Sequence, residues 1–332
     1  MTLWRVRLVP LFALACLGVC AVNTPAAAAP SAIEADVAVL SKPASGVVGV
    51  AAWRLDGRGP KILVNADQQF PMASTFKVAV AGAVLARVDK GELRLDQMLA
   101  VPHEMHVDSE VIADRFIHPG VALSVHNLIE LMITQSDNTA TDVMVKAAGG
   151  PGAVTAWVRG QDVSGLRVDG DTAAILRRFF SLPPGQFAQA LEAAMKADPK
   201  LPERGDKPNP LFDNDPLDAS TPMAMSRLLD RIFSGKALSP ESTKVLVGAM
   251  ERCRTGEGRI PGRMPAGTKV AHKTGTLGGS VNDVGVLTLA GGEQVVVSVF
   301  IKQSALPFEA REKVIADVAR SVRDYYAFGP GR

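Results

Sequence analysis

Residues 284–301 read VGVLTLAGGEQVVVSVFI, two β-rich runs joined by the turn AGG at 290–292. Paired glycines between β-branched runs are typical of a β-hairpin. Near the other end of the chain, residues 46–55 (GVVGVAAWRL) and 61–64 (KILV) give a second hairpin signal. Strands at both ends, with a long stretch between them, predict one sheet that is assembled from the two ends of the chain.

The stretch between these strands carries helical patterns. Residues 74–86 (STFKVAVAGAVLA) are apolar on nearly every face, which is typical of a helix buried on all sides. Ser124 can cap a further helix, and residues 186–196 and 311–326 place their apolar side chains at helical spacing. The sequence therefore predicts an α/β fold of the α+β kind. We expect a sheet lobe from about 31–85 and 240–332 and a helical lobe from about 86–239, with a cleft between them.

The first thirty residues form a separate segment. Arg5 and Arg7 precede an apolar run at 8–22, and small residues follow at 26–29, which is the pattern of a secretory signal peptide. The alternative is a membrane anchor, but the run is short for a bilayer. We expect a secreted or periplasmic protein of residues 31–332, with no stable membrane span once the leader is removed.

Composition excludes several other classes. The chain has 332 residues, of which 47% are hydrophobic and 21% charged, so it is neither disordered nor collagen-like. The formal net charge is +2, and no basic stripe points to a nucleic-acid partner. We expect a monomer.

Cysteine and histidine patterns argue against a metal site. Cys16 and Cys20 fall in the predicted leader, which leaves Cys253 without a disulfide partner. Cys253 has no histidine near it in the sequence, so we expect a structural thiol. His103 and His106 are three residues apart rather than four, so they do not form the zinc motif H-E-x-x-H, and we expect solvated histidines. No cofactor or metal is implied.

Three short motifs carry the chemistry, in the order Ser74-Thr75-Phe76-Lys77, Ser136-Asp137-Asn138 and Lys273-Thr274-Gly275. Each is weak alone, but together and in this order they are a strong signal. Residues three apart on a helix share a face, so the Lys77 amine can reach the Ser74 hydroxyl. Burial lowers the pKa of a lysine, which would let Lys77 act as the base for a serine nucleophile. The alternative is an ordinary surface lysine.

The second motif supplies polar groups beside this pair. Ser136 can relay a proton from Lys77 to a leaving nitrogen, and the Asn138 amide can hold a substrate carbonyl or orient Lys77. The alternative is a simple helix cap, in which Ser, Asp and Asn are common.

The third motif follows a β-rich run and is expected on a strand. Gly275 would allow a substrate backbone to approach closely. Lys273, Thr274 and Thr276 would form a cationic, hydroxyl-lined place for a substrate carboxylate. The N–H groups of Ser74 and Thr276 are candidates for an oxyanion hole.

These motifs resemble those of the penicillin-recognising serine enzymes, and their order and context are similar to class A β-lactamases in particular. The resemblance covers most of the chain after residue 30, including Thr221-Pro222 at the start of a late helix. Arg259 matches the position at which some class A enzymes keep an arginine to bind the substrate carboxylate. The resemblance implies a five-stranded antiparallel sheet flanked by helices, an all-helical lobe and an acyl-enzyme on Ser74.

One departure from the family pattern concerns release of the acyl group. Class A enzymes activate the hydrolytic water with a glutamate, and at the family's spacing that position holds Thr172. The arginine that pins the loop falls on Gly170, and the asparagine that helps to hold the water falls on Leu176. Losing a positioned base costs about 10²–10⁴-fold in rate, so we expect easy acylation and slow deacylation. Asp171 is an alternative base.

The stretch 179–218 follows this loop. It is either a lid that supplies Glu192 or Glu203 to the cleft or a surface insertion, and the second interpretation is favoured.

Three functions remain open from the sequence. A β-lactam-hydrolysing serine enzyme is favoured by the similarity along the whole chain. A peptidoglycan D,D-peptidase or penicillin-binding protein, acting on peptides that end in D-Ala-D-Ala, is suggested by the missing glutamate. A β-lactam binder that keeps its acyl group is the third.

Overall fold

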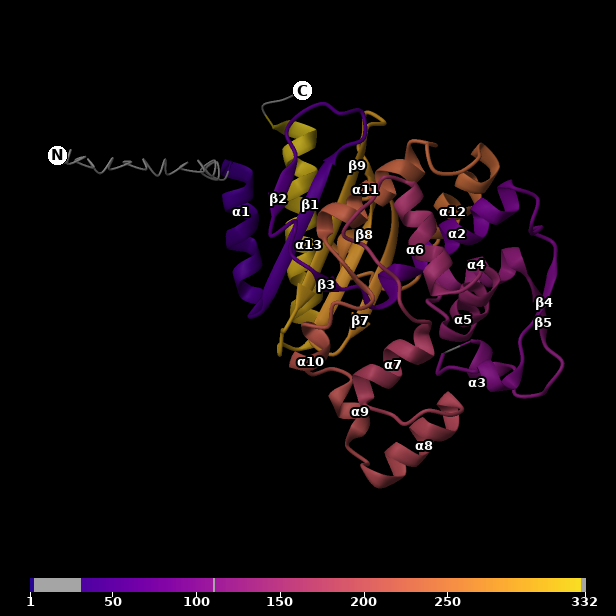
Figure 1. Ribbon diagram of the computed structural model, residues 1–332. Coiled ribbons are helices and arrows are strands. Elements are labelled where there is room, and N and C mark those ends of the chain that lie inside the picture. Colours follow the sequence, from indigo (N-terminus) through magenta and orange to yellow (C-terminus); the bar gives the residue numbers. More distant parts are fainter. Residues whose placement is uncertain (3–30, 110, 330–332) are drawn as a thin grey trace. The chain divides into compact units, whose positions relative to one another are not determined.

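The computed structural model describes residues 1–2, 31–109 and 111–329, so most of the predicted leader lies outside the described residues. Its main sheet has five strands in the order β2-β1-β9-β8-β7, and every neighbouring pair is antiparallel (Figure 1). The strands of this sheet are β1 (Val47–Arg54), β2 (Ile62–Val64), β7 (Lys269–Leu277), β8 (Ser280–Thr288) and β9 (Gln294–Lys302). The prediction of one sheet from both ends of the chain is confirmed.

The two faces of the sheet bury alternate residues of each strand. On β9, Val295, Val297 and Val299 pack into a core shared with the first and last helices. Val296 and Phe300 point to the opposite face and join the larger core of the helical region. Side chains alternate along a strand, so a continuous valine-rich run is what a sheet covered on both faces requires.

Helices cover both faces of this sheet. The first and last described helices, α1 and α13, share one apolar core with it, while α11 packs on the other face (Figure 1). The α-helices are α1 (Ala32–Ser41), α2 (Lys77–Asp89), α3 (Ile112–Arg115), α4 (Val125–Thr134), α5 (Asn138–Ala147), α6 (Pro151–Gly160), α7 (Thr172–Phe180), α8 (Phe187–Ala197), α9 (Leu201–Arg204), α10 (Pro210–Asp213), α11 (Pro222–Phe233), α12 (Pro240–Glu251) and α13 (Phe308–Phe328).

Short elements complete the described part of the chain. Its 3₁₀ turns are η1 (Lys42–Ala44), η2 (Ala73–Phe76), η3 (His103–Met105) and η4 (Ile260–Arg263). Two small antiparallel pairs join β3 (Phe70–Pro71) to β6 (Ala219–Ser220) and β4 (Met98–Ala100) to β5 (Ala122–Ser124). Within the described residues, no helix combines the length and apolarity that crossing a bilayer requires.

The helix predicted at 74–86 begins differently from the expectation. Ala73 has φ +44°, and the chain then turns as 3₁₀ helix through Phe76 before α2 starts at Lys77. From Lys77 to Leu85, every residue of α2 is buried, as the uniformly apolar sequence predicts. Other predicted boundaries are closer. Ser124 caps α4 by accepting from the N–H of Asn127, and Thr221 caps α11.

The stretch 179–218 contains three short helices and returns to the body at Asp218. The Arg178 guanidinium pairs with Asp215 at 3.1 Å and also with Asp218, so one cation ties the end of the stretch to α7 near its start. Asp218 also accepts the N–H groups of Asp169 and Gly170, at 2.7 and 3.0 Å. The loop before α7 is therefore pinned by Asp218 and Arg178, although the family's arginine position holds glycine.

Candidate active site

Ser74 lies in the 3₁₀ turn η2, which packs against strand β7. A Cβ at Gly275 would lie 2.5 Å from the Met72 carbonyl oxygen and 3.1 Å from the Ser74 nitrogen, so only glycine lets the strand and the turn meet. The close approach at Gly275 is made by the chain's own backbone, and its expected role toward a substrate stays a prediction. Within the described residues, the Ser74 hydroxyl has no hydrogen-bond partner.

Asn282 fixes the same turn from the sheet. Its side-chain nitrogen donates to the carbonyl oxygens of Pro71 and Met72, at 2.9 and 3.1 Å, and its amide oxygen accepts from the Ile301 N–H at 3.2 Å. Asn282 is fully buried on β8. Sequence reasoning missed it, because a single asparagine in a strand carries no recognisable pattern.

Lys77 is the first residue of α2 and is completely buried. Its side-chain nitrogen donates to the Ser136 carbonyl at 2.6 Å and to the Asn138 side-chain oxygen at 2.8 Å, and it is 3.2 Å from the Ser136 hydroxyl. Burial and the charge of Lys273 hold the pKa of Lys77 well below its ordinary value. None of these hydrogen bonds reaches Ser74, so the direct Ser74–Lys77 contact stays a prediction.

Ser136 lies between the two lysines. Its hydroxyl is 3.2 Å from the Lys77 amine and 3.0 Å from the Lys273 amine. Ser136 has φ +58°, a left-handed conformation that is uncommon for a residue with a side chain and often marks a functional constraint. The neighbouring Asp137 caps α5 by accepting from the Ala140 N–H at 2.7 Å. Asp137 is therefore the helix cap that the alternative interpretation predicts. Ser136 and Asn138, on either side of it, contact the lysines.

Asn138 uses both ends of its amide. The oxygen accepts from Lys77, and the nitrogen donates to the Asp108 carbonyl at 2.7 Å. Of the two expected roles, the geometry matches the orientation of Lys77. Among the described residues, the amide nitrogen has no hydrogen-bond partner beyond this carbonyl.

Lys273 is fully buried on β7 and donates to the Ser136 hydroxyl and to the Thr274 carbonyl at 2.9 Å. Burial lowers the pKa of Lys273 to about 8, and the charge of Arg259 acts in the same direction. The Thr274 hydroxyl is 2.6 Å from the hydroxyl of Thr255, a residue that the sequence patterns did not single out.

Arg259 lies behind Thr276 and is almost entirely buried. Its guanidinium donates to the Thr276 hydroxyl at 2.6 Å and to the carbonyls of Gly275 and Asn282 at 3.1 and 2.8 Å. Glu312 pairs with it at 2.9 Å. One N–H of the terminal nitrogen that holds Thr276 stays available, and Thr276 itself is exposed.

A small cavity of about 60 Å³ shows what surrounds the Ser74 side chain. The cavity is lined by Ala73, Ser74, Phe76, Asn138, Thr172, Ile175, Leu176, Thr276 and Leu277. Thr172 and Leu176 therefore lie beside Ser74, as the family spacing predicts. No carboxylate is among the lining residues.

The acidic groups near Thr172 serve the backbone. Asp142 on α5 accepts the N–H groups of Thr172 and Ala173 at 2.7 and 3.0 Å. Burial, together with the charge of Asp171, raises the pKa of Asp142 to about 7. Asp171 caps α7 by accepting from the Ala174 N–H at 2.8 Å. Sequence analysis missed Asp142, which belongs to no motif and is recognised only from its contacts.

The two glutamates of the 179–218 stretch lie elsewhere. Glu192 pairs with Lys196 on the surface of α8, and Glu203 lies 4.0 Å from Lys207. Neither lines the Ser74 cavity, which agrees with the favoured interpretation of a surface insertion. His103 and His106 stack at 4.3 Å, and His106 is buried rather than solvated as expected. Among the residues that the structure describes, no cluster could hold a metal ion.

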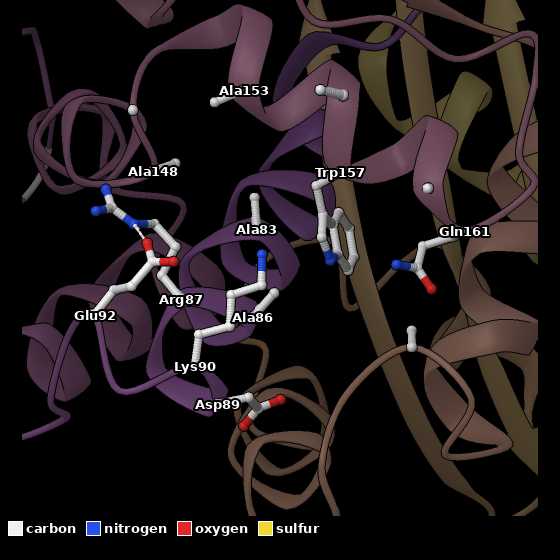
Figure 2. A pocket seen from close by; sticks show the side chains of 14 residues that line it. Ala83, Ala86, Arg87, Asp89, Lys90, Glu92, Ala148, Ala153, Trp157 and Gln161 are labelled. Carbon is white, nitrogen blue, oxygen red and sulfur yellow. Dashed lines mark hydrogen bonds and ion pairs between the residues drawn. The ribbon is translucent and has the colours of Figure 1, made fainter.

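A larger cavity, of about 840 Å³, lies between α2 and α6 (Figure 2). Its walls include Trp157, Lys90 and the ion pair of Arg87 with Glu92, at 2.8 Å. No serine, cysteine or histidine lines it. The larger cavity is therefore not the one beside Ser74, and cavity volume does not identify the candidate active site.

Comparisons with known proteins agree on one relationship. A sequence profile of the β-lactamase enzyme family matches residues 32–326. The chain is 30% identical over 286 residues to the extended-spectrum β-lactamase PER-1 of Pseudomonas aeruginosa, covering 84% of this chain and 82% of that one. It is 28% identical over 289 residues to β-lactamase VEB-1 of the same organism, covering 84% and 85%.

Solved structures give the same picture. A β-lactamase from Chitinophaga pinensis superposes with a TM-score of 0.72 at 29% identity, covering 89% of this chain and 100% of that one. An ancestral class A β-lactamase superposes with a TM-score of 0.72 at 35% identity, covering 87% and 98%.

Proposed function

The chain belongs to the β-lactamase enzyme family, and on that premise we propose that it opens β-lactam rings through an acyl-enzyme on Ser74 and releases the acyl group slowly. Family and fold confirm the resemblance to class A enzymes and the expected antiparallel sheet. The relatives are named β-lactamases, so the comparisons do not favour the peptidase or the binder. The observation that supports this proposal most directly is that the side-chain nitrogens of Lys77 and Lys273 both lie within hydrogen-bond distance of the Ser136 hydroxyl.

Acylation needs a base for the Ser74 hydroxyl. Deep burial favours the neutral form of Lys77, and a neutral amine has two N–H groups and one lone pair. The two shortest hydrogen bonds, to the Ser136 carbonyl and the Asn138 oxygen, use the N–H groups. The lone pair then faces the Ser136 hydroxyl at 3.2 Å. It has to turn to the Ser74 proton when the substrate closes the site, as hydrogen bonds at a catalytic centre often tighten only in the complex.

Ring opening also needs a proton on the leaving nitrogen. Ser136 is hydrogen-bonded to both lysines, so it can pass a proton to the nitrogen and be reprotonated from Lys77. Lys273 supplies positive charge at the same hydroxyl and stabilises its transient anion. The N–H groups of Ser74 and Thr276 are proposed to bind the oxyanion.

Substrate binding is assigned to the exposed end of β7. Thr276 presents an exposed hydroxyl, and the buried Thr274 adds a hydroxyl that is also hydrogen-bonded to Thr255. Arg259 contributes its remaining N–H and its charge for the substrate carboxylate. Asn138 has one N–H left for the acyl-chain carbonyl. These residues come from the proposed helical lobe (86–239) and the proposed sheet lobe (31–85 and 240–332), so the site would lie where the lobes meet.

Slow deacylation follows from the cavity beside Ser74. By the family's spacing, Thr172 and Leu176 fall at the positions of a glutamate and an asparagine, and no carboxylate lines the space. A water there has no strong base, which costs about 10²–10⁴-fold in rate. Asp171 and Asp142 are both engaged with backbone N–H groups of α7.

The test mixes the purified protein with a chromogenic cephalosporin and follows absorbance and intact mass together. We expect a burst of one equivalent, a mass adduct and a slow steady rate. A Ser74→Ala variant should form no adduct, whereas an adduct on that variant would refute the assignment. Release of D-alanine from a peptide ending in D-Ala-D-Ala, at a rate exceeding β-lactam turnover, would instead establish the peptidase.

Export is the second part of the proposal. The pattern of Arg5, Arg7 and the following apolar run supports a leader that is removed before about residue 31, where the capped helix α1 begins. The mass of the protein recovered from the periplasm or medium should match a chain that starts close to Ser31. Recovery of the uncleaved chain from the membrane fraction alone would contradict export.

A further inference from the structure

Strand β7 presents a second set of reactive side chains beside the third motif. Side chains alternate along a strand, so His272 and Thr274 lie on one face while Lys273 and Gly275 lie on the other. The Lys273 face meets Ser136 and the Ser74 turn. The His272 face meets Cys253, which follows the end of α12.

His272 is held by a carboxylate. Its Nδ1 is 2.9 and 3.0 Å from the two oxygens of Asp283, which is fully buried on β8. The imidazole has room because Gly285 stands opposite it, and a Cβ there would lie 2.8 Å from the His272 Cβ. Fixing Nδ1 in this way turns the other ring nitrogen toward a second partner.

That partner is the thiol of Cys253, which lines the same cavity as His272 and interacts with its side chain. The sequence expectation of a cysteine without a histidine was wrong, because the loop after α12 brings residue 253 back to a strand that begins sixteen positions later, at Lys269. Burial raises the pKa of the thiol, but the hydrogen bond and charge of His272 lower it to about 7. The pKa of His272 rises to about 10, since Asp283 and the thiolate outweigh its burial.

Cys253 and His272 open into a cavity of about 440 Å³ that shares no lining residue with the Ser74 cavity. Its other walls are Glu251, Glu257, Pro261, Thr268, Lys269 and Val270. Cys253 is partly exposed, so a small reagent can reach it. Among the walls, two carboxylates and the thiolate outnumber the Lys269 ammonium and the His272 imidazolium, which favours a reagent that carries amino groups.

We propose that Cys253, His272 and Asp283 form a thiolate site that reacts with small amine-bearing disulfides and thereby modulates the serine site. The Cys253 sulfur attacks one sulfur of the disulfide, a new S–S bond forms and the old one breaks. The released thiolate takes a proton from the His272 imidazolium. The product is a mixed disulfide on Cys253 and one free small thiol.

A short path links this site to the third motif. The Cys253 sulfur is 3.4 Å from the Thr255 hydroxyl, which is 2.6 Å from the Thr274 hydroxyl. Lys273 donates to the Thr274 carbonyl, and the charge of Cys253 acts on the pKa of Lys273. An adduct that removes the thiolate charge and pushes on Thr255 is therefore expected to slow acylation of Ser74. This last step rests on the proposed function.

The experiment exposes the native full chain to cystamine at pH 7 and locates the adduct by peptide mass mapping. At that pH, about half of a thiol of pKa 7 is thiolate, against a few per cent of an ordinary cysteine, and its lower nucleophilicity offsets part of the gain. We expect native Cys253 to react about threefold faster than the same residue in the urea-unfolded chain. A slower native reaction would show a merely buried thiol and overturn the proposal.

Two further arms test the partners and the cavity. His272→Gln should slow the native reaction about fivefold or more, and an unchanged rate would remove histidine from the site. If that variant does not fold, the comparison of native and unfolded wild type decides. Cystamine should react faster than dithiodiglycolate, a matched anionic disulfide, and equal rates would overturn the choice of amine-bearing reagents.

The link to Ser74 has its own measurement. Acylation by a chromogenic cephalosporin should slow at least twofold in the adduct and recover after reduction, while Cys253→Ser should not respond to cystamine. Unchanged acylation of the adduct would overturn the link. Formation of the Cys253 adduct is measured without a β-lactam. Failure of the thiolate site is therefore distinguishable from failure of the proposed function.

Discussion

The two faces of strand β7 place nucleophiles in different surroundings. On one face, Ser74 lies in a cavity of about 60 Å³ and depends on two buried lysines whose pKa values are lowered. On the other face, Cys253 opens into about 440 Å³ beside a histidine whose pKa is raised. A serine needs a neutral base nearby, whereas a thiolate needs a positive charge. One strand meets both needs because its side chains alternate.

The largest expected effect comes from removing the base on the serine face. Lys77→Met keeps the volume of the side chain and removes the amine, so acylation of Ser74 should fall about 10³-fold. Stopped-flow absorbance with a chromogenic cephalosporin measures this rate. Lys90→Met, at an exposed position just after the opposite end of α2, is the matched control and should acylate normally. Equal rates in both variants would remove Lys77 from the mechanism.

The buried carboxylate behind the serine face should make stability depend on pH. Because the pKa of Asp142 is raised from 3.8 to about 7, the folded state binds its proton more tightly than the unfolded state does. Below pH 4, the contribution of Asp142 to the free energy of unfolding does not change with pH. It falls by up to about 4 kcal/mol between pH 4 and 7 and is constant again above pH 7. Urea titrations across this range should show a flatter profile for Asp142→Asn. If the free energy of unfolding depended on pH equally in the wild type and in Asp142→Asn, the raised pKa of Asp142 would be contradicted.

Placing a carboxylate beside Ser74 should speed deacylation without speeding acylation. Thr172→Glu combined with Leu176→Asn places a carboxylate and an amide beside Ser74, and we expect deacylation to rise about 10²-fold while acylation changes little. The decay of the acyl adduct in intact-mass measurements gives the rate. Leu176→Asn alone is the control, because it opens space without adding a base. An adduct that persists equally in both would show that the cavity does not hold the hydrolytic water.

The smallest effect concerns the contact between β7 and the Ser74 turn. Gly275→Ala forces a methyl group into 2.5 Å contact with the Met72 carbonyl, and we expect a loss of about 1–3 kcal/mol in stability together with slower acylation. Gly152→Ala, in α6 with open space around it, should instead be neutral or stabilise by up to about 1 kcal/mol. Thermal unfolding and acylation rates measured side by side would sharpen this contrast, and equal stability losses would refute the packing role.

Sequence reasoning predicted the sheet, the main helices and most of the groups around Ser74. Alternating or continuous β-branched runs specify strands, and a uniformly apolar segment specifies a buried helix, because both patterns depend on local geometry. The three motifs could be located because each consists of three or four consecutive residues. The contact of Gly275 with the Met72 carbonyl was not predicted, since sequence cannot say which backbone approaches a glycine.

The amino-acid sequence by itself determined which segments become strands and helices and which nucleophile and lysines the chain possesses, because these follow from neighbours within a few positions. Only the tertiary structure decided that Asp142 holds the start of α7, that Asn282 fixes the Ser74 turn and that His272 meets Cys253. These contacts join residues tens to hundreds of positions apart, and burial then sets their pKa values. Contacts between residues that are distant in the sequence leave no pattern among neighbouring residues, so they can be identified only in the folded structure.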